Sequence, residues 1–248
     1  MNPWRIVSIG GGAIAEGLTL GIDREIVRLT GKSRPRLLFI PTASGDDPEY
    51  CGNAEKHFGG RLGCRVETLL VWKKHPPAAE IARKIRAADI IYVGGGNTLK
   101  MVNRWKHLGI DRLIRAAGRR GAVLCGLSAG SICWYRWGNS DSWAKGPHDK
   151  TLIRVSGLGL LPGLICPHYD GEAHREESLK RMMRRTPGVA IALQDCSAIE
   201  IVGDRWRVVL SKPGQKVFRV YRRRGRDHRE ALPADGWQPL KTLLEKPR

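Results

Sequence analysis

The sequence predicts an α/β protein with a doubly wound, mostly parallel sheet and an antiparallel C-terminal edge. Short apolar runs alternate with segments of helical spacing along most of the chain, as is typical of helices that cover both faces of a parallel sheet. Beyond residue 198 the apolar runs follow one another closely, separated by turns at Gly203-Asp204 and Pro213-Gly214. That spacing indicates antiparallel pairing at the end of the chain.

Strands are predicted at apolar runs, most of them unbroken, which suit strands buried on both faces of a sheet. In chain order they span residues 5–9, 36–40, 65–71, 90–93, 122–125, 160–166, 189–193, 198–202, 206–210 and 216–221. Helices are predicted where apolar residues recur every three or four positions. They span residues 18–29, 51–62, 78–87, 98–105, 109–119, 131–137 and 172–184. The polar segment 139–150 is predicted to be a loop at the rim of a site.

A single hydrolytic domain over residues 1–248 is predicted, because a chain of 248 residues needs no second core. Residues 222–248 begin with a run of arginines and are predicted to form a basic C-terminal tail. No apolar run reaches the roughly 20 residues that span a bilayer, and the first residues lack a signal-peptide pattern. We therefore expect a soluble protein with no membrane partner.

The cysteine pattern and the net charge bear on compartment and partners. The six cysteines form no C-x-x-C pair, which fits reduced thiols in the cytoplasm. The formal net charge is +19, but the charges are scattered along the chain, which favours a generally basic surface. We do not expect a nucleic-acid partner, although the charge leaves one open. The oligomeric state is left open too.

The strongest candidate for a catalytic residue is Ser128, in the segment GLSAG at residues 126–130. An apolar run precedes the segment and a helix-compatible stretch follows it, which is the setting of a nucleophile elbow. Flanking glycines allow a tight turn that exposes the hydroxyl. The Ala129 amide is a natural oxyanion-hole donor, and we predict that the Gly95 amide, in a second glycine turn, is the other. That turn has an alternative reading as a helix start capped by Asn97 or Thr98.

Serine needs a general base to become nucleophilic. His168 follows the predicted strand 160–166 and fits that role, with His174 and His148 as second choices. The acid that orients the histidine is predicted at one of two loop positions, Asp141 or Asp195. Either aspartate has an alternative role as a turn residue that bonds its own backbone.

A glycine motif after the first strand raises a different enzyme class. Residues 10–15 read GGGAIA, which matches the dinucleotide-binding pattern G-x-G-x-x-A. The acidic residue that should follow the second strand is missing. We therefore expect no organic cofactor, and the lack of a C-x-x-C pair leads us to expect no metal either.

The segments at residues 92–98, 126–131 and 167–168 together resemble the dipeptidase E and cyanophycinase family of serine peptidases. This family includes aspartyl dipeptidase and has a class I glutamine amidotransferase-like fold. The resemblance implies that Ser128 is the nucleophile and His168 the base, with Asp141 as the preferred acid. Asp195 ranks second, at a place where some members have a glutamate. It also implies that Arg175 binds an acidic substrate side chain; the alternative for Arg175 is an exposed residue paired with Glu172.

The predicted function is that of a serine peptidase acting on short peptides near their N-terminus, above all Asp-X dipeptides. Asn97 is predicted to contact the substrate together with Arg175. One alternative is a cyanophycinase-like isopeptide hydrolase, whose long charged substrate would suit a positive surface. The other is a non-catalytic nucleic-acid-binding protein on the same scaffold, suggested by the arginines near residue 222.

Overall fold

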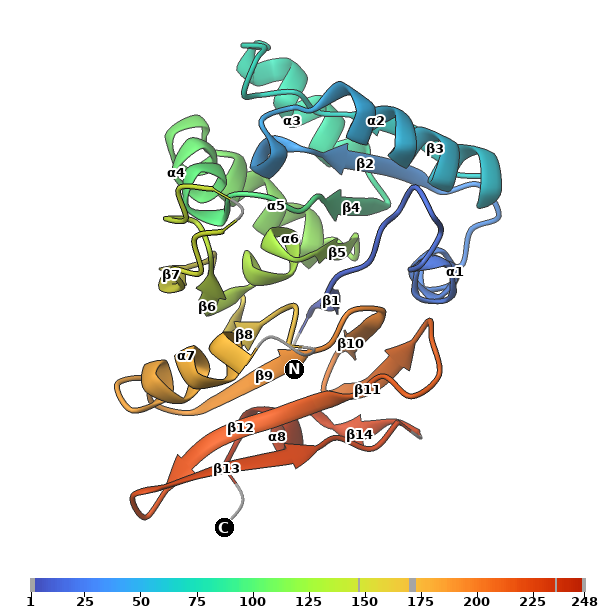
Figure 1. The fold of residues 1–248 in the computed structure, drawn as a ribbon. Coiled ribbons are helices and arrows are strands. Elements are labelled where there is room, and N and C mark those ends of the chain that lie inside the picture. The colour runs from blue at the N-terminus through green and yellow to red at the C-terminus, as the bar shows by residue number, and fades with distance from the viewer. Residues whose placement is uncertain (1–2, 147, 170–172, 235, 247–248) are drawn as a thin grey trace.

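The structure is a computed structural model that describes residues 3–146, 148–169, 173–234 and 236–246. It contains two β-sheets with helices packed on them (Figure 1), so the predicted mixed α/β class is confirmed. The antiparallel strands of the second half are divided between the two sheets. Among the described residues, no helix is long and apolar enough to cross a membrane.

The first sheet has eight strands in the order β14-β11-β10-β1-β5-β4-β2-β3. Their bounds are β1 Arg5–Ile9, β2 Arg36–Ile40, β3 Arg65–Thr68, β4 Ile90–Val93, β5 Val123–Leu127, β10 Ser197–Val202, β11 Arg205–Leu210 and β14 Gln238–Pro239. The first five run parallel to one another, and β10, β11 and β14 extend the sheet in antiparallel fashion. The carboxyl ends of the parallel strands therefore lie along one edge, where α/β proteins place their sites.

Helices cover both faces of this sheet because side chains of successive strand residues point to opposite faces. One face packs against α1 (Leu20–Arg28), α2 (Pro48–Ala54) and the π-helix η2 (Glu55–Arg61). The other packs against α3 (Ala78–Ala87), α4 (Thr98–Leu108) and α5 (Ile110–Arg119). The short helix α6 (Ala129–Ile132) follows β5 directly.

The second sheet has six strands in the order β13-β12-β9-β8-β6-β7. Their bounds are β6 Tyr135–Ser140, β7 Ile153–Ser156, β8 Leu161–Cys166, β9 Val189–Leu193, β12 Val217–Arg223 and β13 Arg226–Ala231. Strands β6, β8 and β9 are mutually parallel. Helix α7 (Ala173–Met183) packs on one face of the sheet, and the core of the first sheet continues onto the other face through Ile165 and Ile191.

Two predicted segments differ most from the structure. The helix predicted at residues 131–137 ends at Ile132, and residues from Tyr135 onward form strand β6. The local cause is the run of bulky aromatic residues there, which favours a strand. The segment predicted as a basic tail contains β13, β14 and the helix α8 (Leu240–Leu244), in which Leu243 is fully buried.

Candidate active site

Ser128 sits in a strained turn at the carboxyl end of β5. Its backbone has φ 54° and ψ −112°, a conformation that costs a non-glycine residue roughly 1–3 kcal/mol. A Cβ atom on Gly126 or Gly130 would lie 2.5 Å or 2.1 Å from the carbonyl oxygen of Val93, at the end of β4. Only glycine fits at these two positions, so the nucleophile-elbow prediction matches the local backbone.

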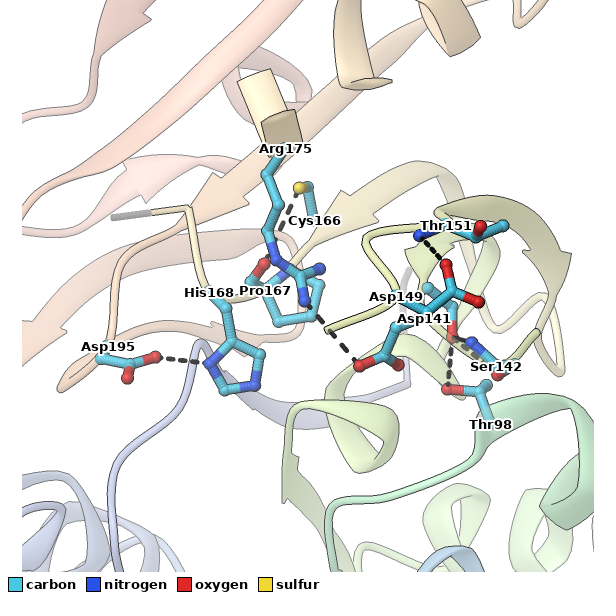
Figure 2. A network of polar contacts seen from close by, with 11 residues as sticks. Thr98, Asp141, Ser142, Asp149, Thr151, Cys166, Pro167, His168, Arg175 and Asp195 are labelled. Carbon is cyan, nitrogen blue, oxygen red and sulfur yellow. Dashed lines mark hydrogen bonds and ion pairs between the residues drawn. The ribbon is translucent and has the colours of Figure 1, made fainter. Parts of the chain in front are cut away.

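His168 lies beyond the end of β8 and also has a positive φ, of 53°. Its Nδ1 atom lies 2.7 Å from Oδ1 of Asp195, in the turn after β9. Figure 2 shows the carboxylate and the imidazole facing each other across this contact. The hydrogen bond from His168 lowers the pKa of Asp195 despite partial burial, and the positive charge of Arg175 acts in the same direction. Asp195 is therefore ionised at neutral pH.

The end of β1 brings Ser128 and His168 together. The Ser128 amide donates to the carbonyl of Ile9 at 3.1 Å, and the His168 amide donates to the next carbonyl, that of Gly10, at 3.3 Å. Gly11 follows, and a Cβ there would lie 2.0 Å from Oδ1 of Asp195 and 2.5 Å from the imidazole. The missing side chain of Gly11 thus makes the room in which the His168–Asp195 pair fits. This role of the first glycine turn was not predicted from the sequence, in which the same glycines match a dinucleotide-binding pattern.

The two candidate acids have different partners in the structure, and the contact with His168 favours Asp195 over Asp141, which the sequence ranks first. Asp141 does not contact His168 in the described structure. Its Oδ2 atom lies 4.0 Å from Nη2 of Arg175, and its side chain is 59% exposed. Asp195, ranked second, contacts the histidine. Both aspartates follow strands that neighbour β8, one on each side, so adjacency in the sheet alone does not distinguish them.

Arg175 is buried on α7, with a relative exposure of 7%. The alternative of an exposed arginine is therefore wrong, and Glu172, its suggested partner, lies outside the described residues. Figure 2 shows the side chain reaching from α7 toward Asp141. The 4.0 Å separation is too long for a hydrogen bond. The Arg175 charge acts on the Asp195 carboxylate, and a guanidinium is a strong binder of carboxylates.

The predicted oxyanion-hole donors have unequal surroundings. Among the described residues, no acceptor takes a hydrogen bond from the Ala129 amide, which directly follows the nucleophile candidate. The Gly95 amide donates to the hydroxyl of Tyr50 at 3.2 Å. Burial raises the pKa of Tyr50 to about 12, so this hydroxyl stays protonated. A Cβ on Gly95 would lie 3.5 Å from Cβ of Ser128, which shows how closely the two turns approach.

Asn97 has a structural role at the N-terminus of α4. Its Oδ1 accepts from the Lys100 amide at 3.0 Å, which is the N-cap contact given as the alternative role. Its Nδ2 donates to the carbonyl of Ser142 at 2.9 Å. The Ser142 hydroxyl contacts Ser140 at 2.7 Å and accepts from the Leu99 amide at 3.2 Å. Asn97 thus ties the loop that carries Asp141 to the helix. A contact between Asn97 and substrate stays a prediction.

The arrangement on this fold is of the class expected for a hydrolase: the candidate serine Ser128 and the His168–Asp195 pair follow the carboxyl ends of parallel strands. The sequence profile of Peptidase family S51 matches residues 6–209. The chain belongs to this family and is a peptidase, so the predicted enzyme class and family are confirmed.

Individual relatives agree with the family. The uncharacterized peptidase YgaJ of Bacillus subtilis (strain 168) is 35% identical over 219 residues, which are 87% of this chain and 91% of the relative. Peptidase E of Streptomyces coelicolor is 28% identical over 76% of this chain and 75% of its own. The crystal structure of a peptidase from an acI-B1 Actinobacterium has the same fold, with a TM-score of 0.73, 19% identity and coverage of 95% of this chain and 96% of that chain.

Proposed function

We propose that this peptidase is a serine peptidase that hydrolyses short peptides near their N-terminus, with Asp-X dipeptides as its preferred substrates. The observation that carries the mechanism is the 2.7 Å contact between His168 and Asp195 beside the strained turn of Ser128. Each of the three roles of a catalytic triad then has one residue: Ser128 is the nucleophile, His168 the base, and Asp195 the acid that orients the base.

The reaction begins when the Ser128 hydroxyl attacks the scissile carbonyl and His168 Nε2 takes its proton. Asp195 holds the other ring proton on Nδ1 and stabilises the imidazolium that forms. The Ala129 amide donates to the oxyanion. His168 then protonates the leaving amine, and water, activated by the same histidine, releases the acyl group from Ser128.

The described structure contains no hydrogen bond between the Ser128 hydroxyl and His168, a contact that often tightens only when substrate is bound. Gly95 becomes the second oxyanion donor once its amide leaves the Tyr50 hydroxyl for the substrate. Because a hydrogen bond to an oxyanion is stronger than one to a neutral hydroxyl, the exchange is favourable in the transition state.

The preference for acidic substrates rests on Arg175. The Arg175 side chain is buried on α7, and its Nη2 atom lies 4.0 Å from the carboxylate of Asp141, which is 59% exposed. A substrate carboxylate between Arg175 and the catalytic residues would accept two parallel hydrogen bonds. Asp141 then limits the size and charge of what enters this space.

A cytoplasmic location is the setting we propose for this activity. Burial raises the pKa of the Cys125 and Cys133 thiols well above the usual range, so neither thiol is reactive. Unreactive buried thiols fit a reducing compartment.

The test compares hydrolysis of Asp-Leu, Glu-Leu, Ala-Leu and N-acetylated Asp-Leu by wild type and variants. Ser128→Ala should lower kcat by at least about 10³-fold, while Ser131→Ala, a buried serine on the same short helix, keeps most activity. Arg175→Met should lower kcat/KM for Asp-Leu by about 100-fold, as expected from losing charge-assisted hydrogen bonds, and leave Ala-Leu within about threefold. Full turnover by Ser128→Ala would refute the mechanism. Equal losses on Asp-Leu and Ala-Leu in Arg175→Met would refute the specificity.

A further inference from the structure

The edge of the first sheet that lies opposite the active site is strongly basic. Strands β1, β2 and β3 begin with Arg5, Arg36 and Arg65. Because these strands are parallel, the three arginines lie at the same edge, and Ser128 follows the far end of β5. The sequence alone does not reveal this grouping, since the charges are spread over more than 60 residues of chain.

Two of these arginines are direct neighbours. Arg36 and Arg65 are register partners on adjacent parallel strands, and adjacent strands lie about 4.8 Å apart. Like charges at paired positions destabilise a sheet. Such an arrangement is relieved when an anion binds between the two guanidinium groups.

The arginines line a continuous open groove. One hollow of about 760 Å³ and one of about 390 Å³ share Lys32, Arg86 and Asp89 in their walls. Together they contain seven cationic side chains and one carboxylate. The cations are Arg5, Lys32, Arg34, Arg36, Arg65, Arg86 and Arg120. We call this surface the basic groove.

Little within the protein neutralises the basic groove. Asp89 accepts from Lys32 Nζ at 2.7 Å. Desolvation acts to raise the pKa of Asp89, but the contacts with Lys32 and Arg36 outweigh it, so the pKa is lowered. Among the described residues, no carboxylate forms an ion pair with Arg34, Arg65 or Arg86. The carboxyl ends of α1, α3 and α5 also reach this edge, but each contributes only about −0.5 charge.

We propose that the basic groove binds the phosphate backbone of a nucleic-acid duplex. A duplex presents closely spaced phosphates along a line, which suits several exposed guanidinium groups along an open groove. No aromatic residue lines the groove in the described structure, so stacking of single-stranded bases has no platform. The contact reads the backbone and not the sequence, and it leaves the active site at the opposite edge open.

The first measurement is binding of a fluorescent 20-base-pair DNA duplex to the full chain, followed by anisotropy between 50 and 200 mM NaCl. Lys32 is held by Asp89, which leaves six cations for phosphates. Six neutralised phosphates predict a loss of affinity of roughly 10³-fold over this range of salt. An affinity that is absent at 50 mM NaCl, or that does not respond to salt, overturns the proposal.

Matched variants locate the contact. The triple variant Arg34→Gln, Arg65→Gln and Arg86→Gln should reduce the salt effect to roughly 40-fold, since three phosphate contacts remain. A control with the same loss of charge replaces three exposed arginines elsewhere, Arg184, Arg224 and Arg226, and should keep the wild-type response. Equal effects of the two triple variants would mean a general basic surface and overturn the assignment.

Three further readouts separate the duplex from other partners. Peptide hydrolysis by the groove variant should equal that of wild type, which shows that the variant is folded. Tighter binding of a single-stranded 20-mer than of the duplex would overturn the proposal, because it requires stacking. Tighter binding to vesicles of anionic lipid than to the duplex, lost in the groove variant, would assign the surface to a membrane instead.

Discussion

Replacing Asp195 with Asn tests the catalytic assignment most directly, because it keeps the shape of the side chain and removes its charge. The carboxylate lies 2.7 Å from His168 Nδ1, so its charge is about 4 Å from the centre of the imidazolium formed during catalysis. Such a pair is worth about 1 kcal/mol in water and about 4 kcal/mol near a protein surface. The Asp195 side chain is 41% exposed. We therefore take an intermediate loss of about 2 kcal/mol in the stabilisation of the imidazolium, which corresponds to a decrease in kcat of roughly 30-fold.

A second effect of the same change is on the histidine tautomer. An Asn amide donates to Nδ1, which leaves the ring proton on Nε2 and blocks its role as a base. Loss of the correct tautomer alone can reduce kcat by about 10⁴-fold in a serine hydrolase triad. We therefore expect Asp195→Asn to lower kcat by between about 30-fold and 10⁴-fold, with little change in KM.

The assay measures kcat and KM on Asp-Leu for wild type, Asp195→Asn, Asp195→Glu and Asp141→Asn. Asp195→Glu should keep activity within about tenfold, because it restores the charge near Nδ1. Asp141→Asn should leave kcat within about threefold and lower KM, since Arg175 then loses a competing carboxylate. The reasoning is refuted if Asp141→Asn abolishes turnover while Asp195→Asn remains active.

Three other predictions follow from the structure. Arg207→Ala removes the 2.7 Å ion pair of the buried Glu200 carboxylate and should lower the free energy of unfolding by roughly 3–5 kcal/mol in urea titrations. Burial raises the pKa of Asp23 above its usual 3.8; the folded state thus binds the proton more tightly, and stability falls as pH rises from about 4 through the raised pKa. Asp23→Asn should remove that part of the slope above about pH 4. Gly130→Ala places a Cβ 2.1 Å from the carbonyl oxygen of Val93 and should lower kcat by at least about 100-fold, because the elbow must shift.

Each of these predictions has a control. Arg205→Ala, on the same strand as Arg207 and exposed, should change stability by less than about 1 kcal/mol; an equal loss would contradict the buried-pair argument. If the free energy of unfolding of Asp23→Asn depends on pH as that of wild type does, another group causes the dependence. Gly52→Ala, in α2 with open space around the new methyl group, should be neutral or stabilising by up to about 1 kcal/mol. Activity lost equally there would contradict the steric argument.

The signals that make Ser128 and His168 candidates are local in the sequence. Glycines on either side of a serine after an apolar run define the elbow, and the histidine directly follows the end of a predicted strand. The orienting acid could not be predicted in this way. Asp141 and Asp195 follow strands on opposite sides of β8, so adjacency in the sheet allows both. In the structure, the Asp195 carboxylate lies 2.7 Å from His168 Nδ1, a contact that neither local pattern contains.

The strands were predicted best where they are buried on both faces, as at residues 36–40 and 90–93, which match β2 and β4. Helix 131–137 was wrong because a helix was expected to continue after the elbow, whereas the chain leaves α6 after one turn and enters the second sheet. The division into two sheets was also missed. Sheet membership is decided by long-range packing, which the spacing of apolar residues does not encode.

The position of β1 has a consequence for how the protein is made. This strand lies between β5 and β10, and Ile9 pairs with Ala198 near the other end of the chain. The Ile9 carbonyl, at the end of β1, accepts from the Ser128 amide. The carbonyl of the next residue, Gly10, accepts from the His168 amide. During translation, β1 is made before both of its partner strands, and it can pair with β10 only after residues 197–202 have been synthesised. A nascent chain that has not reached residue 195 therefore cannot form the contact between His168 and Asp195.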